Sequence, residues 1–526
     1  MSSSDIAPEK SARWTTGPAI VAYLALAKFV LHLVFQNYDY FRDELYFFAC
    51  ADHLAWGYVD QPPAVAVLVK LSTTLFGTSL IGIHILPAFA GALKIVLTGM
   101  IVRELGGRRF AQFLAAVAVL FAPVYLSIDA YISMNCLEPL WWMGCVYLLL
   151  RMINGASQKL WLGFGVLAGL GLQTKYSIAI FACGIVIGLL LTEHRRMLAT
   201  PWIYLGGLIA AAIFFPNFWW QYTRDWPFLQ LMANIRANGR DVQLSPIRYI
   251  LEQLLLMGPA AGPLWTTGLV LLFTERMKKY RVLGWAYVIT LTAFIVMHGK
   301  NYYLNPAYPM LIAAGAIGFE RWTLKGAPGP SPRSSALSWV RPALVAYMVV
   351  FGALLLPYTL SILSPPKFIA YMDVIGIRPP ASETHRQSPL PQQYADMFGW
   401  REMTDKVAVY YNALPADERA KTAIFGNNYG EAGAIDFFGP KYGLPKAISG
   451  HQNYWYWGPR NYTGESVIII GEDDVDALRN KWCQSVTLVA ELNHPYAMPF
   501  ENRAIWHCRG MRVNLQQVWP KLKSWG

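Results

Sequence analysis

Apolar stretches of membrane-spanning length follow one another along the first two-thirds of this chain. They recur from Ile20 to Leu363, and beyond Leu363 the chain turns polar. An α-helix needs about 20 mostly apolar residues to cross the hydrocarbon core of a bilayer, and lipid leaves unpaired backbone groups without hydrogen-bond partners. The sequence therefore predicts an α-helical polytopic membrane protein whose last third folds outside the bilayer.

About eleven transmembrane helices are expected at the usual span length. Their expected positions are residues 18–36, 79–102, 111–127, 138–152, 160–174, 177–192, 200–219, 250–273, 282–297, 304–320 and 340–362. The apolar segment Pro62–Phe76 is not counted among them. A further crossing there would put the later basic loops on the face opposite the basic N-terminus, so we expect an interfacial or re-entrant helix instead.

Basic residues gather in the short segments between the apolar spans. With the expected spans, every basic cluster falls on one face, and positive loops mark the cytoplasmic side. The chain then divides into a cytoplasmic N-terminus at residues 1–17, a transmembrane domain at 18–363 with a first outer loop at 37–78, and an extracytoplasmic domain at 364–526. Because these loops account for the formal charge of +12, nucleic acid is not an expected partner.

The last third has the composition of a small α/β domain. Residues 392–414 place their apolar side chains broadly on one helical face. Short apolar runs typical of strands lie at 422–425, 466–470 and 486–489. Two cysteines of this domain, Cys483 and Cys508, could form a disulfide in an oxidising compartment or remain free thiols, and the sequence leaves both open.

The predicted outer loops hold most of the carboxylates that could act at a membrane surface. They are Asp43 and Glu44 just beyond the first span, Asp60 before a Pro-Pro pair, and Asp129 and Glu138 in the second loop. Each has a structural alternative. Asp43 could cap an interfacial helix and Glu138 could favour a helix N-terminus through the macrodipole, while Asp129 is expected to be solvated.

Cationic and aromatic side chains are expected at the same face. The last short outer loop carries His298, Lys300, Tyr302 and Tyr303, and Lys175 lies where the fifth span reaches the outer side. A cation at the lipid–water boundary can neutralise the phosphate of a lipid-linked substrate as a point charge. The alternative for each lysine is to snorkel toward the lipid head groups.

Patterns for other chemistries do not rise above chance in this sequence. The His and Cys residues lack metal-ligand spacing, and there is no phosphate-binding loop or Ser-His-Asp pattern. The predicted cytoplasmic loops are too short for a nucleotide-binding domain. This argues against enzymes that use cytosolic nucleotide sugars or ATP.

A series of short motifs follows the first span in a recognisable order. They are Arg42-Asp43-Glu44-Leu45-Tyr46, Asp60-Gln61-Pro62-Pro63, Leu75-Phe76-Gly77, Glu138-Pro139, Thr174-Lys175-Tyr176 and the Tyr-Tyr-Leu-x-Pro-x-Tyr-Pro segment from Tyr302 to Pro309. Over roughly residues 18–320 this order resembles glycosyltransferase family 39 and its relatives. That superfamily, of the C-type glycosyltransferase fold, includes protein O-mannosyltransferases and the lipid A aminoarabinose transferase.

The resemblance implies an inverting, multi-pass transferase of the bacterial inner membrane that acts in building the cell envelope. It would take a sugar from a polyprenyl phosphate and pass it to a lipid, glycan or protein acceptor outside the membrane. Asp43 would be the general base on the acceptor hydroxyl, with Glu44 supporting it. Asp60 would bind a divalent metal or shape the cavity, and Glu138, with Asn135 as a rival match, would be the second-loop acid. The donor phosphate site would hold Lys175, His298, Lys300, Tyr302 and Tyr303.

Two positions depart from the family pattern, and two other functions compete with the transferase. His84 stands where relatives usually carry Arg, and Gln61 where Lys is frequent. The first rival is a lipid or sugar transporter, or flippase, without transferase chemistry. Transporters usually place charged residues within spans near the midplane, whereas most acids here are expected in loops. The second is a non-catalytic subunit whose aromatic stretch His451–Tyr462 stacks on a carbohydrate.

Overall fold

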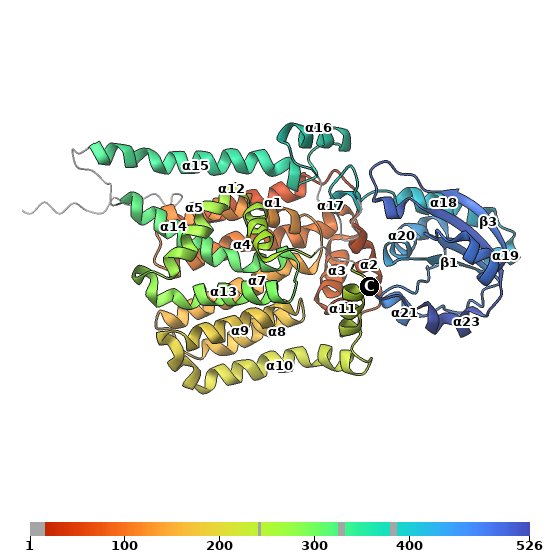
Figure 1. Ribbon diagram of the computed structural model, residues 1–526, viewed down its shortest axis with the longest axis horizontal. Coiled ribbons are helices and arrows are strands. Elements are labelled where there is room, and N and C mark those ends of the chain that lie inside the picture. Colours follow the sequence, from red (N-terminus) through yellow and green to blue (C-terminus); the bar gives the residue numbers. More distant parts are fainter. Residues whose placement is uncertain (1–15, 240–242, 325–331, 379–386) are drawn as a thin grey trace, which may run out of the picture.

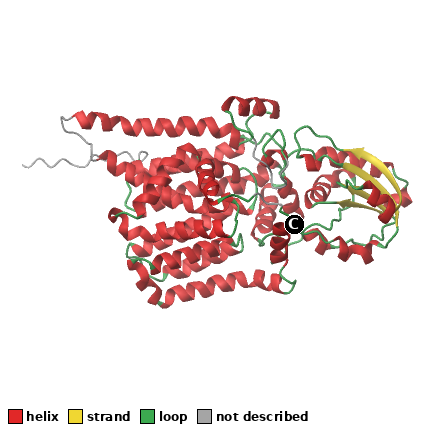
Figure 2. Cartoon of the chain, viewed as in Figure 1, coloured by secondary structure: helices red, strands yellow, loops and turns green. Residues whose placement is uncertain are grey.

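The computed structural model describes residues 16–239, 243–324, 332–378 and 387–526. They form an elongated molecule with a bundle of long helices at one end and a smaller domain at the other (Figure 1). Figure 2 shows that the described strands all belong to the smaller domain. The α-helical membrane architecture with a C-terminal sheet domain is therefore confirmed.

Long apolar helices make up the bundle. They are α1 (Gly17–Val34), α4 (Leu80–Glu104), α5 (Arg109–Phe121), α7 (Met134–Ile153), α8 (Leu160–Leu172), α9 (Ser177–Leu190), α10 (Pro201–Tyr222), α12 (Pro246–Leu272), α13 (Arg281–Val296), α14 (Tyr308–Leu324) and α15 (Pro332–Thr359). Each expected transmembrane range overlaps one of them. Among the described residues, seven helices are long and apolar enough to cross a bilayer, so the number of crossings stays a prediction.

Small residues let the bundle helices approach closely. A Cβ on Gly268 of α12 would collide with the carbonyl oxygen of Leu311 on α14, and one on Gly315 of α14 would collide with that of Leu264. Close backbone approach is a principal source of helix–helix packing in lipid, where burial of apolar area between helices gives little free energy.

Shorter helices connect the bundle helices. They are α2 (Arg42–Asp52), α3 (Ala64–Phe76), α6 (Pro123–Ile128), α11 (Pro227–Ala237) and α16 (Pro365–Ile375), with 3₁₀ helices η2 (Glu193–Ala199), η3 (Glu275–Tyr280) and η4 (Asn301–Ala307). Helices α2, α3 and α11 lie between the bundle and the C-terminal domain (Figure 1). The helix expected at Pro62–Phe76 is present as α3, and its depth in the bilayer stays a prediction.

The C-terminal domain is built on a four-stranded mixed sheet. Its strands are β1 (Thr422–Gly426), β2 (Ser466–Ile470), β3 (Cys483–Glu491) and β4 (Ala504–Met511), in the order β1-β2-β4-β3. Strands β1 and β2 are parallel, with Thr422 opposite Ser466, and the other pairs are antiparallel. The three expected strands are confirmed, and β4 was not predicted.

Short helices surround this sheet. They are α17 (Gln392–Ala395), α18 (Trp400–Ala413), α19 (Ala416–Lys421), α20 (Tyr429–Phe438), α21 (Asn453–Trp457), α22 (Val475–Ala477) and α23 (Leu515–Val518), together with η5 (Gly439–Tyr442), the π-helix η6 (Leu478–Trp482), η7 (Pro499–Glu501) and η8 (Trp519–Leu522). The helix expected over residues 392–414 is broken between α17 and α18. Gly399 takes a positive φ of 92° there, which an L-residue with a side chain rarely adopts. The break frees the Asp396 carbonyl to accept hydrogen bonds from the Arg42 N–H (3.0 Å) and the Trp400 indole N–H (2.8 Å).

A disulfide joins β3 to β4. The Sγ atoms of Cys483 and Cys508 are 2.06 Å apart, and both residues are fully buried. Of the two states that the sequence left open, the structure has the bonded one. Disulfides persist in oxidising compartments, which agrees with the extracytoplasmic side expected for this domain.

Asp129 is not solvated, and the expectation that it would be is wrong. Its side chain is fully buried, with one carboxylate oxygen 3.1 Å from the Lys28 ammonium of α1 and the other in contact with the Lys94 ammonium of α4. Position in a short loop suggested exposure, but the loop folds inward over Gly91, where a Cβ would meet the Asp129 carboxylate. A buried charge needs such partners, because desolvation in their absence is unfavourable.

Replacing Asp129 with Asn should destabilise the bundle strongly. Two lysine ammonium groups would lose their common carboxylate, and the loss of one partner of a buried ion pair typically costs about 3 to 5 kcal/mol. Thermal unfolding of the purified protein in detergent measures the effect, with Asp476→Asn at an exposed position of the C-terminal domain as the control. Equal unfolding temperatures for the two variants would contradict the buried network.

Candidate active site

Glu44 is a structural acid that holds α2 in place. Its side chain is fully buried. One oxygen accepts the Phe41 N–H at the start of the helix (2.9 Å), and the other accepts the Ile132 N–H (2.7 Å) and lies 2.8 Å from His84 Nε2. The carboxylate thus joins α2 to α4 and to the segment between α6 and α7. His84, one of the two departures from the family pattern, is a partner of this acid.

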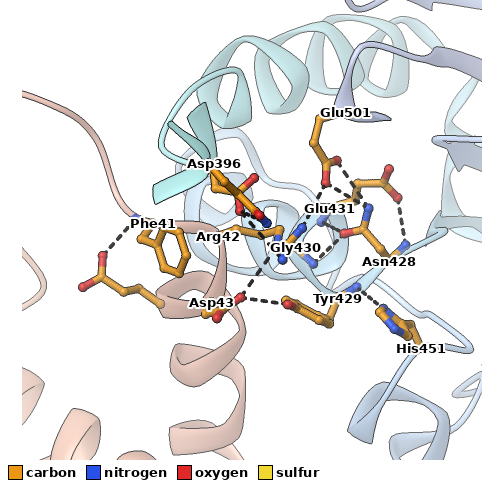
Figure 3. Close-up of polar contacts among 12 residues, drawn as sticks. Phe41, Arg42, Asp43, Asp396, Asn428, Tyr429, Gly430, Glu431, His451 and Glu501 are labelled. Carbon is orange, nitrogen blue, oxygen red and sulfur yellow. Dashed lines mark hydrogen bonds and ion pairs between the residues drawn. The ribbon is translucent and has the colours of Figure 1, made fainter. Parts of the chain in front are cut away.

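Asp43 has a different environment from its neighbour. Its side chain is 35% exposed, so this acid remains accessible from solvent. The hydroxyl of Tyr429, at the start of α20, donates a hydrogen bond of 2.8 Å to Oδ1, and Arg42 Nε lies 3.6 Å from the same oxygen. Figure 3 shows Tyr429 reaching Asp43 from the C-terminal domain. Of the two adjacent acids, Asp43 is the one that can meet a substrate.

Arg42 fastens the C-terminal domain to α2. Its guanidinium is nearly buried and lies 3.8 Å from a carboxylate oxygen of Asp396 and 3.8 Å from one of Glu501. It also lies over the ring of Tyr429, 5.3 Å from the centroid. Burial raises the pKa of Asp396 to about 7, an effect that the Arg42 charge opposes. Burial likewise raises the pKa of Glu501.

Asp60 is connected to Asp43 through two aromatic rings. The Tyr46 hydroxyl donates to Asp60 Oδ1 at 3.1 Å, and the Tyr46 ring packs on the Tyr429 ring with centroids 4.9 Å apart. Tyr429 in turn donates to Asp43. The backbone N–H of Val59, the residue before Asp60, donates to Asn453 Oδ1 of the C-terminal domain (2.8 Å). Asp43 and the backbone next to Asp60 therefore both contact the C-terminal domain.

A metal site at Asp60 finds no support in the side chains around it. Within the described ranges, no three His, Cys, Asp or Glu residues are grouped so as to hold a metal ion. Hard divalent cations usually bind through several oxygen ligands. We therefore assign no metal-dependent step to these residues.

Lys175 is fixed at the centre of a polar and aromatic cluster. Its ammonium lies 3.0 Å from Glu138 Oε2 and 3.0 Å from Asn135 Oδ1. It also lies 4.1 Å from the ring centroid of Tyr303 and 5.2 Å from that of Tyr302. The two rival second-loop positions, Glu138 and Asn135, thus both contact the lysine. With 16% of its side chain exposed, Lys175 is held in place rather than snorkelling freely.

Glu138 and the lysine cluster occupy the same end of the bundle as the first loop. The Ser177 hydroxyl donates to Glu138 Oε1, which fixes the acid within the cluster. The backbone N–H of Ala64, at the start of α3, donates to the Gln173 carbonyl oxygen (3.0 Å), two residues before Lys175. Gln221 donates to the Tyr58 carbonyl oxygen (3.0 Å), which ties α10 to the same loop. These bonds place the cationic cluster beside the loop that carries Asp60.

The structure separates the residues of the last short loop. Tyr302 and Tyr303, both in η4, reach Lys175, as described above. His298 is exposed and has a positive φ of 54° at the end of α13, where the chain turns. Lys300 is half-buried, and its carbonyl oxygen accepts a hydrogen bond from the Tyr249 hydroxyl (3.1 Å). The roles expected for His298 and Lys300 in binding the donor stay predictions.

Sequence reasoning missed the residues that the C-terminal domain contributes. Asn428 and Glu431 form a capping box, in which each side chain accepts a backbone N–H at the start of α20. The pattern Asn-x-x-Glu is a recognisable helix start, so the position of Tyr429 in a first helical turn could have been predicted. Its contact with Asp43 joins residues 386 positions apart, and no local pattern carries that information.

Comparisons with known proteins agree on the fold. Residues 60–220 match the family described as dolichyl-phosphate-mannose-protein mannosyltransferase. The structure of ArnT from Cupriavidus metallidurans bound to undecaprenyl phosphate is similar with a TM-score of 0.59, 12% sequence identity, and coverage of 93% of this chain and 97% of that one. The apo structure of ArnT gives a TM-score of 0.57 at 14% identity. At such identity the likeness concerns the fold alone.

A curated relative matches part of the chain. Over 206 residues the sequence is 26% identical to the lipid A galacturonosyltransferase RgtD of Rhizobium johnstonii, covering 37% of this chain and 41% of that protein. The chain thus matches less than half the length of this relative. Together these similarities confirm the resemblance to the family 39 glycosyltransferases and their C-type fold.

Proposed function

Because this chain resembles the family 39 glycosyltransferases in its C-type fold and in residues 60–220, we propose that it transfers a sugar from a polyprenyl-phosphate donor to an acceptor at the extracytoplasmic face. One observation carries this proposal: a partly exposed carboxylate, Asp43, and a partly exposed ammonium, Lys175, are held at the same end of the helix bundle. Transfer from a phosphate leaving group needs both kinds of group, a base and a cation.

Asp43 is the general base in this proposal. It takes the proton from the acceptor hydroxyl, and the acceptor oxygen forms a bond to the anomeric carbon of the sugar. The bond from that carbon to the phosphate oxygen breaks at the same time, and its electron pair leaves with the polyprenyl phosphate. A single displacement of this kind inverts the anomeric configuration. The proton on Asp43 then passes to solvent, which reaches this partly exposed side chain.

Lys175 stabilises the departing phosphate. An ammonium group has three N–H donors, and Glu138 and Asn135 accept two of them. The third can point to a phosphate oxygen, while the rings of Tyr302 and Tyr303 face the same ammonium. Glu138 holds the lysine in position, and Glu44 holds the helix that carries Asp43. Neither acid needs to touch the substrate.

The donor and acceptor classes take support from the relatives. ArnT has been solved with undecaprenyl phosphate, a polyprenyl phosphate, and RgtD is named for transfer to lipid A. By that analogy the acceptor is a lipid or a lipid-anchored glycan. The predicted positive-inside orientation and the disulfide of the C-terminal domain support an active site at the extracytoplasmic face of the inner membrane.

The charged residues inside the bundle do not support the transporter alternative. Lys28, Lys94 and Asp129 are charged residues of the helical part, as a transporter would have. Their side chains are all 0% exposed and bind one another. A closed network of this kind offers a passing substrate no free group.

Asp43→Asn should reduce sugar transfer from a labelled polyprenyl donor by about 10² to 10⁴-fold, the usual contribution of a general base. Folding should be preserved, because Asp43 is partly exposed. The buried charge of Arg42 would still be balanced by Asp396 and Glu501. The matched control is Asp373→Asn, an exposed aspartate of α16. Near-normal transfer by Asp43→Asn would contradict the assignment of Asp43 as the base. Movement of uncleaved donor across the bilayer of liposomes that contain the protein would favour a transporter.

Tyr429→Phe tests the contribution of the C-terminal domain to Asp43. A hydrogen bond to a charged group is worth about 1.5 to 3 kcal/mol, so kcat should fall about 10- to 100-fold. The KM for the donor should stay the same, because the donor phosphate binds elsewhere, at Lys175. Steady-state kinetics measure kcat and KM separately. The control is Tyr442→Phe, which removes a hydroxyl that donates a hydrogen bond to a different aspartate, Asp405. An unchanged kcat would show that Tyr429 does not position Asp43.

A further inference from the structure

A cavity of about 600 Å³ lies beside α2, on the side away from the candidate active site. It is bounded by the C-terminal half of α2, by α3, by the start of α4, and by α20 with the loop that follows it. Neither Asp43 nor Lys175 lines it. The lining residues of α2 begin at Phe48, which lies five residues, about 7.5 Å along the helix, after Asp43. Tyr40, just before α2, also lines the cavity. We call it the lateral cavity.

The charged side chains of the lateral cavity leave an excess of positive charge. Four cations line it, Lys70, Arg401, Lys441 and Lys446, against the two carboxylates of Asp52 and Asp436. The carboxylates are already engaged. Asp52 pairs with Lys446 at 3.2 Å, and Asp436 accepts the Ala447 N–H (2.7 Å) and the Tyr454 hydroxyl (3.0 Å).

Two lysines of the lining have no carboxylate partner among the described residues. Arg401 is balanced by Asp39, which lies outside the lining. Lys70 and Lys441 are exposed, and neither forms an ion pair with a carboxylate in the part of the chain that the structure describes. They come from separate elements, Lys70 from α3 and Lys441 from η5, and both line the same cavity, so one ligand can contact both.

The rest of the lining suits an anion. Thr73, Thr78 and Ser79 add polar groups, and Ser79 is the N-cap of α4, accepting the Gly82 N–H at 3.1 Å. The positive end of the α4 dipole is therefore at the wall of the cavity. A volume of about 600 Å³ is within the range of small-molecule sites and holds a lipid head group.

An apolar surface begins where the lateral cavity ends. Val67, Leu71 and Leu75 of α3 are 52%, 47% and 60% exposed and follow one another at four-residue spacing. They form one stripe along the helix. Lys70 and Thr73 lie on the same helix beside this stripe and line the cavity. A molecule with a charged head and an apolar chain can bind both surfaces at once.

We propose that the lateral cavity binds the anionic head group of a membrane lipid, with Lys70 and Lys441 contacting the head group and the acyl chain lying along Val67, Leu71 and Leu75. Basic pockets next to membrane helices commonly bind lipid phosphates. The site is separate from the base and from the donor cluster. The proposal concerns binding, and it stands whether or not the bound lipid is the acceptor of the transfer reaction.

Native mass spectrometry of the delipidated full-length protein tests the proposal. The protein in neutral detergent is titrated with phosphatidylglycerol and, separately, with phosphatidylcholine. Wild type should bind one phosphatidylglycerol molecule more tightly than any phosphatidylcholine. The double variant Lys70→Ala/Lys441→Ala should weaken that binding about 30-fold. The control Lys481→Ala/Lys521→Ala removes two exposed lysines elsewhere in the C-terminal domain and should leave it unchanged.

The outcomes separate the lipid from other ligands. Equal phosphatidylglycerol affinity in the double variant and the control, with equal unfolding temperatures, would overturn the site. So would phosphatidylcholine that binds as tightly as phosphatidylglycerol. Displacement of the lipid by an equal concentration of inorganic phosphate would indicate a free-anion site and overturn the lipid assignment. Failure of sugar transfer in Asp43→Asn has no bearing on these titrations.

Discussion

The guanidinium of Arg42 is buried between the helix bundle and the C-terminal domain, where Asp396 and Glu501 balance its charge. Because an unpaired buried charge is strongly unfavourable, this contact stabilises the observed arrangement of the two parts. The break between α17 and α18 serves the same contact, since the freed Asp396 carbonyl accepts the Arg42 N–H. The position of α2, and with it the position of Asp43, depends on this pairing.

The C-terminal domain is therefore part of the site rather than an appendage to it. Tyr429 binds the proposed base, and Asn453 holds the backbone next to Asp60. The bundle supplies the cationic half, in which Lys175 is set by Glu138 and Asn135. In the proposed function, the bundle binds the donor phosphate and the C-terminal domain acts on the base at the acceptor side.

Local patterns predicted the parts of the structure that depend on local physics. The lengths of the apolar segments predicted the bundle helices, and the order of the motifs identified Asp43, Glu138 and Lys175 as candidate site residues. Long-range pairing escaped prediction. Asp129 appeared to be a loop residue, although Lys28 and Lys94 within apolar spans required a carboxylate nearby. Strand β4 escaped because its residues, AIWHCRGM, mix polar and apolar side chains without clear alternation, and pairing with β2 and β3 forms it.

The central claim is that one end of the bundle brings a base and a phosphate-binding cation to the same substrate. An experimental structure of the protein with a polyprenyl phosphate bound tests this most directly. A phosphate oxygen within about 4 Å of Lys175 Nζ, with open space toward Asp43 for the sugar and the acceptor, is the predicted result. A phosphate bound away from Lys175, or a lysine still closed off by Glu138 and Asn135, would contradict the claim.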